Sequence, residues 1–224
     1  MQATLRISLL PIFFLVLGIA HLYGSPILLQ DGDEKYTIGL EVEFLFADKQ
    51  DSLSVEEVSH PSMASQFQES DRLYPNFGHI EQEVWVKIRV DNHTARDDWY
   101  LQIDLTYIDI IDLHYPSAQG WEVMETGWSR PFDSRGKIKA GTFALPLKLP
   151  AHTERTYYLK ASAERGLALP MSIVPEYMAY ESSQDWHIWY GIYTGALLVM
   201  IFYNIFIYFT LRNSNYLFYT FTII

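Results

Sequence analysis

The residues best suited to ligand chemistry lie in a loop-rich stretch, residues 120–136, where aromatic rings and guanidinium groups occur together. Trp121, Trp128, Arg130 and Arg135 fall within it. Indole rings offer flat apolar platforms, and guanidinium forks suit carboxylate or sugar ligands. The combination predicts a concave small-ligand pocket. The alternative is that a tryptophan closes one end of the protein core while the arginines pair with neighbouring acids.

A second candidate ligand surface lies on a predicted strand, where Trp85, Lys87 and Arg89 share the outward face. The same two interpretations, ligand contact or structural packing, apply to these side chains. If the first stretch binds the ligand, Arg135→Ala should weaken binding more than Arg155→Ala does.

Catalytic and metal chemistry are not indicated by the sequence. The seven histidines show no spacing typical of metal ligands, and no glycine-framed nucleophile or phosphate-binding glycine loop is present. The chain has no cysteine, which excludes disulfides and thiolate metal sites. We therefore expect no enzyme activity, no cofactor and no metal site.

The charge distribution argues against nucleic acid or anionic lipid as partners. All 27 acidic residues but only 14 of the 16 basic ones lie between Asp31 and Asp185, which gives this segment a net charge of −13. Polyanions would be repelled by such a domain.

Alternating apolar and polar residues indicate strands through most of residues 25–185. In VWVKIRV at 84–90 every second side chain is aliphatic, which is the period of a half-buried strand. The period recurs at 101–107, 143–149 and 157–161, residues 171–174 form a short apolar run, and turn-forming residues separate these segments. The pattern predicts a mainly β protein, an antiparallel β-sandwich forming one domain.

The first part of this domain is less regular. Residues 36–46 predict either one long strand or a strand pair, with Val42, Phe44 and Phe46 on one face. Ser54 and Glu57 have the spacing of a capping box, so a short helix should follow Ser54 and carry Val55 and Val58 toward the core. Residues 60–79 are read as a long loop.

Two apolar segments predict export and membrane insertion. Arg6 precedes an apolar stretch, residues 7–20, with small residues after it, which is typical of a signal peptide over 1–24; an uncleaved N-terminal anchor is the alternative. Residues 188–211 carry no charge and, as a helix of about 36 Å, would span a bilayer. We predict a first transmembrane helix over 186–211. The predicted fold class of the chain is therefore a β-sandwich followed by a transmembrane α-helix.

The export signal and Arg212 place residues 25–185 outside the cytoplasm and residues 212–224 inside it. The apolar residues 216–224 are expected to be the start of a second transmembrane helix that is cut off. Gly191 and Gly195 permit close helix approach, and Asn204 offers an interhelical hydrogen bond. Internal packing of a helix bundle is the favoured role of these residues, and homodimerisation is the alternative.

Several ordered segments carry a resemblance to a known family. They are VWVKIRVDN at 84–92, WYL at 99–101, IDLHY at 111–115, TGWSRPFDSR at 126–135 and YYLK at 157–160. This series resembles the type 2 extracellular domain of bacterial seven-transmembrane receptors with diverse intracellular signalling modules (7TMR-DISMED2). The segments YGIYTG at 190–195, FYN at 202–204, RN at 212–213 and YL at 216–217 resemble the start of that family's seven-helix region. Trp128 and Lys87 depart from the family motif.

The resemblance implies a periplasmic jelly-roll sensor, similar to carbohydrate-binding modules, in the bacterial inner membrane. Its ligand would be a carbohydrate or another small molecule, and a kinase, diguanylate cyclase or phosphatase domain would provide the output. Two functions remain under consideration: a signalling receptor, and a membrane-anchored binding or adhesion module without signalling output.

Overall fold

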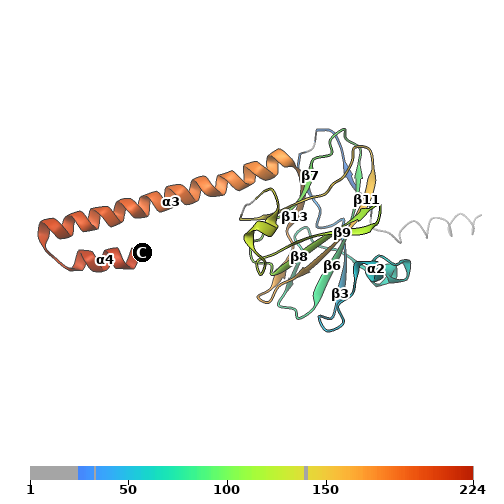
Figure 1. Ribbon diagram of the computed structural model, residues 1–224, viewed down its shortest axis with the longest axis horizontal. Coiled ribbons are helices and arrows are strands. Elements are labelled where there is room, and N and C mark those ends of the chain that lie inside the picture. The colour runs from blue at the N-terminus through green and yellow to red at the C-terminus, as the bar shows by residue number, and fades with distance from the viewer. Residues whose placement is uncertain (1–24, 33, 139–140, 224) are drawn as a thin grey trace, which may run out of the picture. The chain divides into compact units, whose positions relative to one another are not determined.

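The computed structural model describes residues 25–32, 34–138 and 141–223 (Figure 1). The predicted signal peptide, residues 1–24, lies outside the described residues. The chain divides into two compact units, a β domain that ends at Glu176 and a helical unit that begins at Tyr177. Each unit is described by itself below.

The larger sheet of the β domain has seven strands, in the order β4-β3-β6-β11-β8-β9, with β1 pairing with β6 beyond this path. All of its pairs are antiparallel except that between β1 and β6. Its strands are β1 (Ile27–Leu29), β3 (Glu43–Ala47), β4 (Gln68–Glu69), β6 (Glu83–Asn92), β8 (Ile110–Ser117), β9 (Gly120–Thr126) and β11 (Glu154–Ser162).

A four-stranded sheet, in the order β10-β7-β13-β2, forms the second layer, and a two-stranded sheet joins β12 to β5. The four strands are β2 (Tyr36–Thr37), β7 (Trp99–Ile103), β10 (Phe143–Pro146) and β13 (Met171–Pro175), and the small pair is β5 (Asn76–Gly78) and β12 (Leu167–Ala168).

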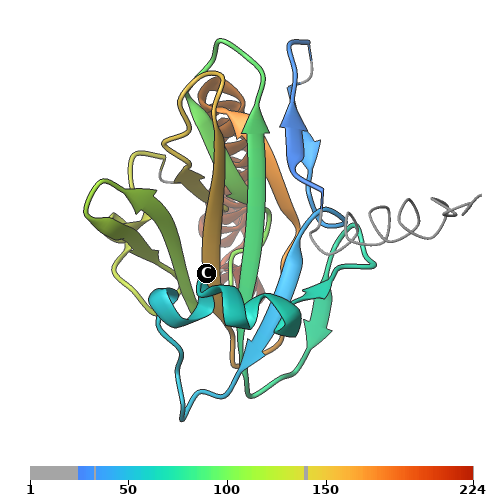
Figure 2. The ribbon, with the colours of Figure 1, turned by 90° about the vertical axis from the view of Figure 1, so that its right-hand side faces the viewer.

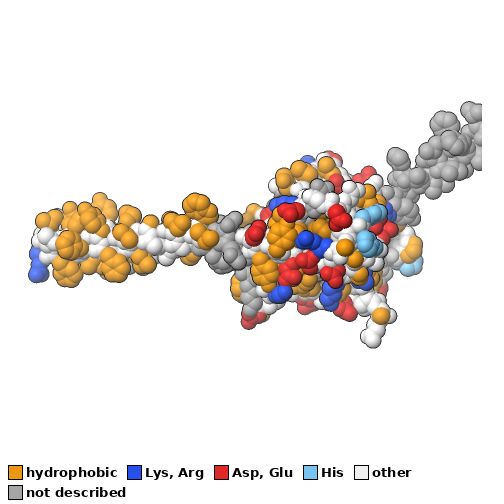
Figure 3. All heavy atoms as spheres, turned by 90° about the horizontal axis from the view of Figure 1, so that it is seen from above, with side chains coloured by type: hydrophobic (Ala, Val, Ile, Leu, Met, Phe, Trp, Pro, Cys, Tyr) orange, Lys and Arg blue, Asp and Glu red, His pale blue; other side chains and the backbone are white. Residues whose placement is uncertain are grey.

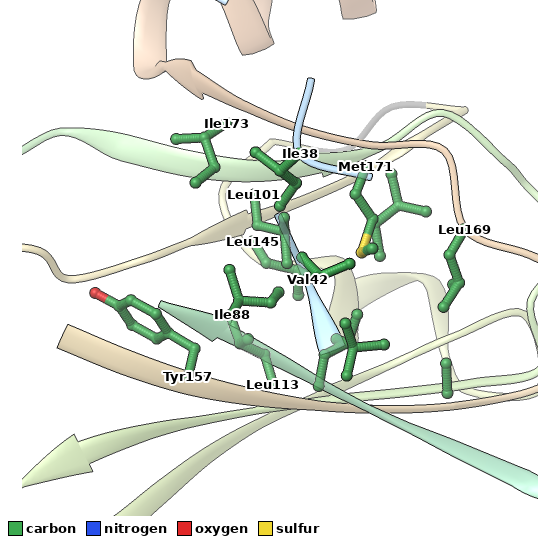
Figure 4. Packing of buried hydrophobic residues seen from close by; sticks show 14 of the residues in the cluster. Ile38, Val42, Ile88, Leu101, Leu113, Leu145, Tyr157, Leu169, Met171 and Ile173 are labelled. Atoms are coloured by element: carbon green, nitrogen blue, oxygen red, sulfur yellow. The ribbon is translucent and has the colours of Figure 1, made fainter. Parts of the chain in front are cut away.

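The main core lies between the two large sheets. Figure 4 shows Ile88, Leu113 and Tyr157 of the larger sheet facing Leu101 and Ile173 of the smaller one. The alternation of β6 explains this arrangement, because its aliphatic side chains at even positions are fully buried while Lys87 and Arg89 lie on the opposite face. The domain is therefore a β-sandwich, as the sequence predicts.

A second hydrophobic cluster covers part of the outer face of the larger sheet. The short helix α2 (Val55–Val58) buries Val55 and Val58 against Trp85 and Tyr158. Figure 2 shows the helical segment formed by α2 and the 3-10 helix η1 (Pro61–Gln66) lying across the strands of this sheet. The predicted helix after Ser54 is confirmed, but it packs on the outer face rather than in the main core.

The helical unit consists of α4 (Asn215–Ile223) and most of α3 (Glu176–Leu211). Ile188–Leu211 has a mean hydropathy of 1.9, and this stretch is long and apolar enough to cross a membrane. Figure 3 shows hydrophobic side chains along the helices, whereas charged side chains of both signs are distributed over the visible face of the β domain. The helix α3 begins at Glu176, earlier in the chain than the predicted start at residue 186.

Several segments differ from the sequence-based expectations. Residues 36–46 form two strands in different sheets, and the predicted loop over 60–79 contains η1, β4 and β5. The predicted loop-rich stretch 120–136 begins with strand β9, paired with β8, and also contains the 3-10 helix η2 (Phe132–Arg135). The strand predicted over 143–149 ends at Pro146, although Leu147 and Leu149 beyond it are fully buried.

Candidate functional site

The principal candidate site is a pocket on the outer face of the larger sheet, which we call the outer pocket. It has a volume of about 420 Å³, within the range of small-molecule sites. Its floor comes from β6, β9 and β11, and its cover comes from the segment around α2 and η1. The floor residues are Lys87, Arg89, Trp121, Thr156 and Tyr158, and the cover residues are Val58, Ser59, His60, Pro61, Ala64 and Phe67.

Local hydrogen bonds hold the cover in place. Ser54 and Glu57 form the predicted capping box, with Ser54 N donating to Glu57 Oε2 at 2.8 Å and Glu57 N donating to Ser54 Oγ at 3.3 Å. These bonds lower the pKa of Glu57. His60 caps η1, because Ser62 N donates to its Nδ1 at 3.3 Å. Since Nδ1 is the acceptor, a neutral His60 carries its proton on Nε2.

Two cations lie side by side on the floor, at alternate positions of β6. Lys87 Nζ lies 3.1 Å from both carboxylate oxygens of Glu43, its partner in the β3–β6 register. Arg89 Nε lies 3.7 Å from Glu154 Oε1 on β11. The first pair is nearly buried, with side-chain exposures of 10% and 11%, whereas Glu154 is 55% exposed. The carboxylate partner of Arg89 is therefore more exposed and more distant than the carboxylate partner of Lys87.

Aromatic rings form the apolar part of the outer pocket. Trp121 packs edge-on against Tyr158, with ring centroids 5.3 Å apart, and the Phe67 ring centroid lies 6.3 Å from that of Tyr158. Lys87 Nζ lies 5.5 Å from the centroid of the Phe67 ring. Burial, together with the charge of Glu43, raises the pKa of Tyr158, so its hydroxyl stays protonated and can donate a hydrogen bond.

Trp85 lies on the same outward face of β6, but it does not provide an exposed surface. Only 1% of it is exposed, because it is buried in the cluster beneath α2. Its ring stacks on His114 at a centroid distance of 5.3 Å and an interplanar angle of 30°. The expectation that Trp85 is available to a ligand is therefore wrong: the cover that forms the outer pocket also seals this indole.

Trp128 and Arg130, from the turn after β9, are positioned by contacts to neighbouring strands and loops instead. Trp128 N donates to Ile108 O at 2.7 Å, and 63% of the residue is exposed. Arg130 Nη1 bonds the Asp112 carboxylate and Thr126 O, the latter at 3.2 Å. Arg130 thus holds the start of the turn to β8, which agrees with the structural interpretation of this arginine.

Arg135 is nearly buried, with 8% of the residue exposed. Its guanidinium carbon lies 4.9 Å from the ring centroid of Phe132 and 4.7 Å from that of Phe143. Burial lowers the pKa of Arg135. The single pocket predicted from residues 120–136 is therefore not what forms: Trp121 lines the outer pocket, while Arg135 packs between two phenylalanine rings.

The membrane-helix residues singled out by the sequence lie on α3. A Cβ atom added at Gly191 or Gly195 would meet nothing within 4 Å, so both glycines leave a smooth helix surface. Asn204 Nδ2 donates to Met200 O of its own helix at 2.8 Å. Interhelical bonding by Asn204 stays a prediction.

Sequence reasoning missed eight of the residues that line the outer pocket, among them His60 and Phe67 of the cover and Thr156 and Tyr158 of the floor. The two strand residues had a usable signal, because Tyr157 and Leu159 point into the core and their neighbours must face outward. The two cover residues had none, since the segment that contains them was read as a loop. Within the described residues, no cluster of His, Asp or Glu is arranged to hold a metal.

A second, smaller pocket of about 210 Å³ lies at the edge of the larger sheet, near β4 and β5. Phe44, Phe46 and Phe77 contribute its aromatic side, and these three rings pack edge to face at centroid distances of 5.0 and 5.5 Å. It contains none of the residues that the sequence predicts as ligand contacts.

Comparisons with known protein families match both units. Residues 39–175 match the 7TMR-DISM extracellular 2 family, and residues 186–224 match the 7TM diverse intracellular signalling family. No curated protein matches the chain. The first match spans more than half of the chain and the β-sandwich that carries the outer pocket; the second coincides with the apolar helices.

These matches favour a signalling receptor over a membrane-anchored module without signalling output. The matched family is a family of sensory receptors and not a known enzyme family. The predicted fold class, a β-sandwich followed by a transmembrane helix, agrees with them. The chain belongs to the 7TMR-DISM extracellular 2 family and forms the extracellular sensor region of a transmembrane signalling receptor, with its N-terminal domain outside the membrane.

Proposed function

We propose that the β domain is a periplasmic sensor in the bacterial inner membrane, which binds a carbohydrate or another small molecule in the outer pocket. The observation that carries the proposal is the convergence of Lys87, Arg89 and Trp121 on one pocket. These residues come from two strands that are not neighbours in the sheet, and each is a residue type that the sequence marks for ligand binding. Apolar walls with a few polar groups are typical of small-molecule sites.

The signal would pass to the membrane through the end of the β-sandwich. Strand β13 leads into α3 without an intervening loop, because Pro175 ends the strand and Glu176 begins the helix. A ligand that binds two domain conformations with different affinities would shift their populations, and the helix bundle would transmit that shift. We expect a kinase, diguanylate cyclase or phosphatase domain to act as the cytoplasmic output partner.

A thermal-shift screen of the full chain in detergent micelles tests this function. Oligosaccharides, organic acids and amino acids are added, and unfolding is followed by tryptophan fluorescence. A ligand of the native state raises the melting temperature with its concentration. Trp121→Ala should abolish the shift, while Trp128→Ala should leave it intact, because Trp128 is outside the outer pocket and 63% exposed. An equal loss in both variants, or in neither, would refute the assignment of the site.

A further inference from the structure

The charged side chains that line the outer pocket are two cations, although the domain around it is acidic. Lys87 and Arg89 lie on the floor, and none of the lining residues, all of them within the described part of the chain, is Asp or Glu. The surrounding segment carries a net charge of −13. Each cation is paired with a carboxylate of the domain, so the pocket favours an anion only where the ligand can replace that carboxylate.

The two cations differ in how firmly their carboxylate partners hold them. Glu43 bonds Lys87 through both oxygens, and both side chains are nearly buried, so this pair is a fixed part of the floor. Glu154 lies at the exposed start of β11, with its oxygen 3.7 Å from Arg89 Nε. Exposed ion pairs at such distances contribute little free energy. An incoming carboxylate can therefore replace Glu154 at Arg89 with little loss.

The groups around Arg89 suit a hydroxylated ring. Thr156 is the direct β11 partner of Arg89 in the strand register, and both residues line the pocket. Side chains opposite each other on paired strands lie close together, so the Thr156 hydroxyl and the guanidinium can contact one ligand. Trp121 and Tyr158 supply flat apolar surface beside them. A fatty acid would leave the Thr156 hydroxyl without a ligand partner, whereas a sugar acid offers a carboxylate to Arg89, a hydroxyl to Thr156 and a ring face to Trp121.

We propose that the outer pocket selects a sugar that carries a carboxylate, and that Glu154 occupies Arg89 until the sugar acid replaces it. The inference rests on the proposed function, because it names the chemical class of the ligand for the same site. Arg89 binds the carboxylate, Thr156 binds a ring hydroxyl, and Trp121 packs against the ring. Lys87 stays paired with Glu43, so it forms part of the floor and leaves Arg89 as the cation that the ligand contacts.

Matched ligand pairs test the charge selectivity on the full chain in detergent micelles. D-glucuronate is compared with D-glucose, and D-galacturonate with D-galactose, by calorimetric titration, with succinate as an acid that lacks the ring. We expect at least one sugar acid to bind about tenfold or more tightly than its neutral partner and than succinate, as for a hydrogen bond to a charged group. Arg89→Gln should remove this difference.

Two variants separate this effect from a general loss of charge or fold. Arg155→Gln removes the same charge from the neighbouring strand; its guanidinium contacts Pro116 O at 3.4 Å and does not line the outer pocket. It should leave the selectivity unchanged. Glu154→Gln removes the competing carboxylate and should tighten sugar-acid binding severalfold, a gain that a merely structural Glu154 would not produce. The unliganded melting temperature of each variant checks its fold.

The outcomes distinguish the inference from the proposed function. If a neutral sugar binds as tightly as its acid and Trp121→Ala abolishes both, the pocket is a sensor site but the inference of acid selectivity is overturned. If succinate matches the sugar acids, the carboxylate alone is recognised and the sugar assignment falls. If none of these sugars and acids binds, the inference fails, and the wider thermal-shift screen decides the proposed function separately. If binding survives Trp121→Ala, the outer pocket is not the sensor site and both proposals fail.

Discussion

The guanidinium carbon of Arg135 lies 4.7 Å from the centroid of the Phe143 ring, at the point where η2 meets the start of β10. Phe132 lies on the same guanidinium at 4.9 Å, so the cation is held by two aromatic rings. A cation over aromatic rings at low exposure stabilises the fold by about 1–2 kcal/mol. This relationship gives Arg135, the last residue of the family-like segment TGWSRPFDSR, a structural role.

Arg135→Ala should lower the free energy of unfolding by about 2–4 kcal/mol, because the buried stem and the cation–ring contacts are lost together. Arg155→Ala is the matched control and should cost less, since Arg155 is only partly buried. Tryptophan fluorescence during chemical denaturation measures both values. The structural assignment would be refuted by an Arg135→Ala protein that keeps its full stability while ligand binding is lost.

Gly127→Ala should destabilise the β domain by more than about 3 kcal/mol, because two penalties act together. Gly127 has φ +141°, and a Cβ atom there would lie 2.2 Å from Asp109 O, a backbone atom that cannot easily move. Gly120→Ala is the control: it has φ +120° and no atom within 4 Å of the added Cβ, so only backbone strain applies. Thermal melting of both variants gives the comparison, and equal losses would contradict the steric argument.

Residues 25–176 should fold as a soluble β-rich monomer without the membrane helices. The domain has its own core between two sheets and a second cluster on the outer face. Its regular helical segments are short ones, α2, η1 and η2, within the described residues. Far-ultraviolet circular dichroism and gel filtration measure the outcome. A predominantly helical spectrum, or a chain that aggregates when purified alone, would disprove independent folding.

The parts of the fold that could be predicted are those with a strong local period. Strands β6, β11 and β13 follow from alternation or a short apolar run, the capping box at Ser54 follows from side-chain chemistry, and the apolar span Ile188–Leu211 follows from composition. Each of these signals is contained in a few consecutive residues. Strand β9 lacked such a signal, because it lies at the edge of its sheet and exposes most of its side chains.

The outer pocket could be predicted only in part, because its geometry depends on strand order. Lys87 and Arg89 on β6 and Trp121 on β9 were each identified from residue type, but β11 and β8 separate these strands in the sheet. Nothing local to either segment indicates this spacing. The burial of Trp85 could not be predicted either, since it depends on where a helix distant in the sequence docks.

His114 should make the stability of the β domain fall as the pH drops below neutrality. The residue is half-buried on β8 with its ring stacked on Trp85. Burial lowers the pKa of His114 and outweighs the opposing effects of Asp112, Glu56 and Glu125. The unfolded chain, with a histidine pKa of about 6.5, therefore binds a proton that the folded domain resists.

The contribution of His114 is fully present above about pH 6.5 and is lost as the pH falls from there through the lower pKa of the folded state. His114→Gln removes the titrating ring, so its stability should depend less on pH between about 7.5 and 5 than that of the parent chain. His152→Asn is the control, because His152 is exposed and its φ of +55° suits asparagine. Melting temperatures of the parent chain and the two variants across this pH range show whether His114 causes the loss of stability in acid. If His114→Gln keeps the parent's slope, another group carries the acid sensitivity, and the stacked imidazole titrates as it would in water.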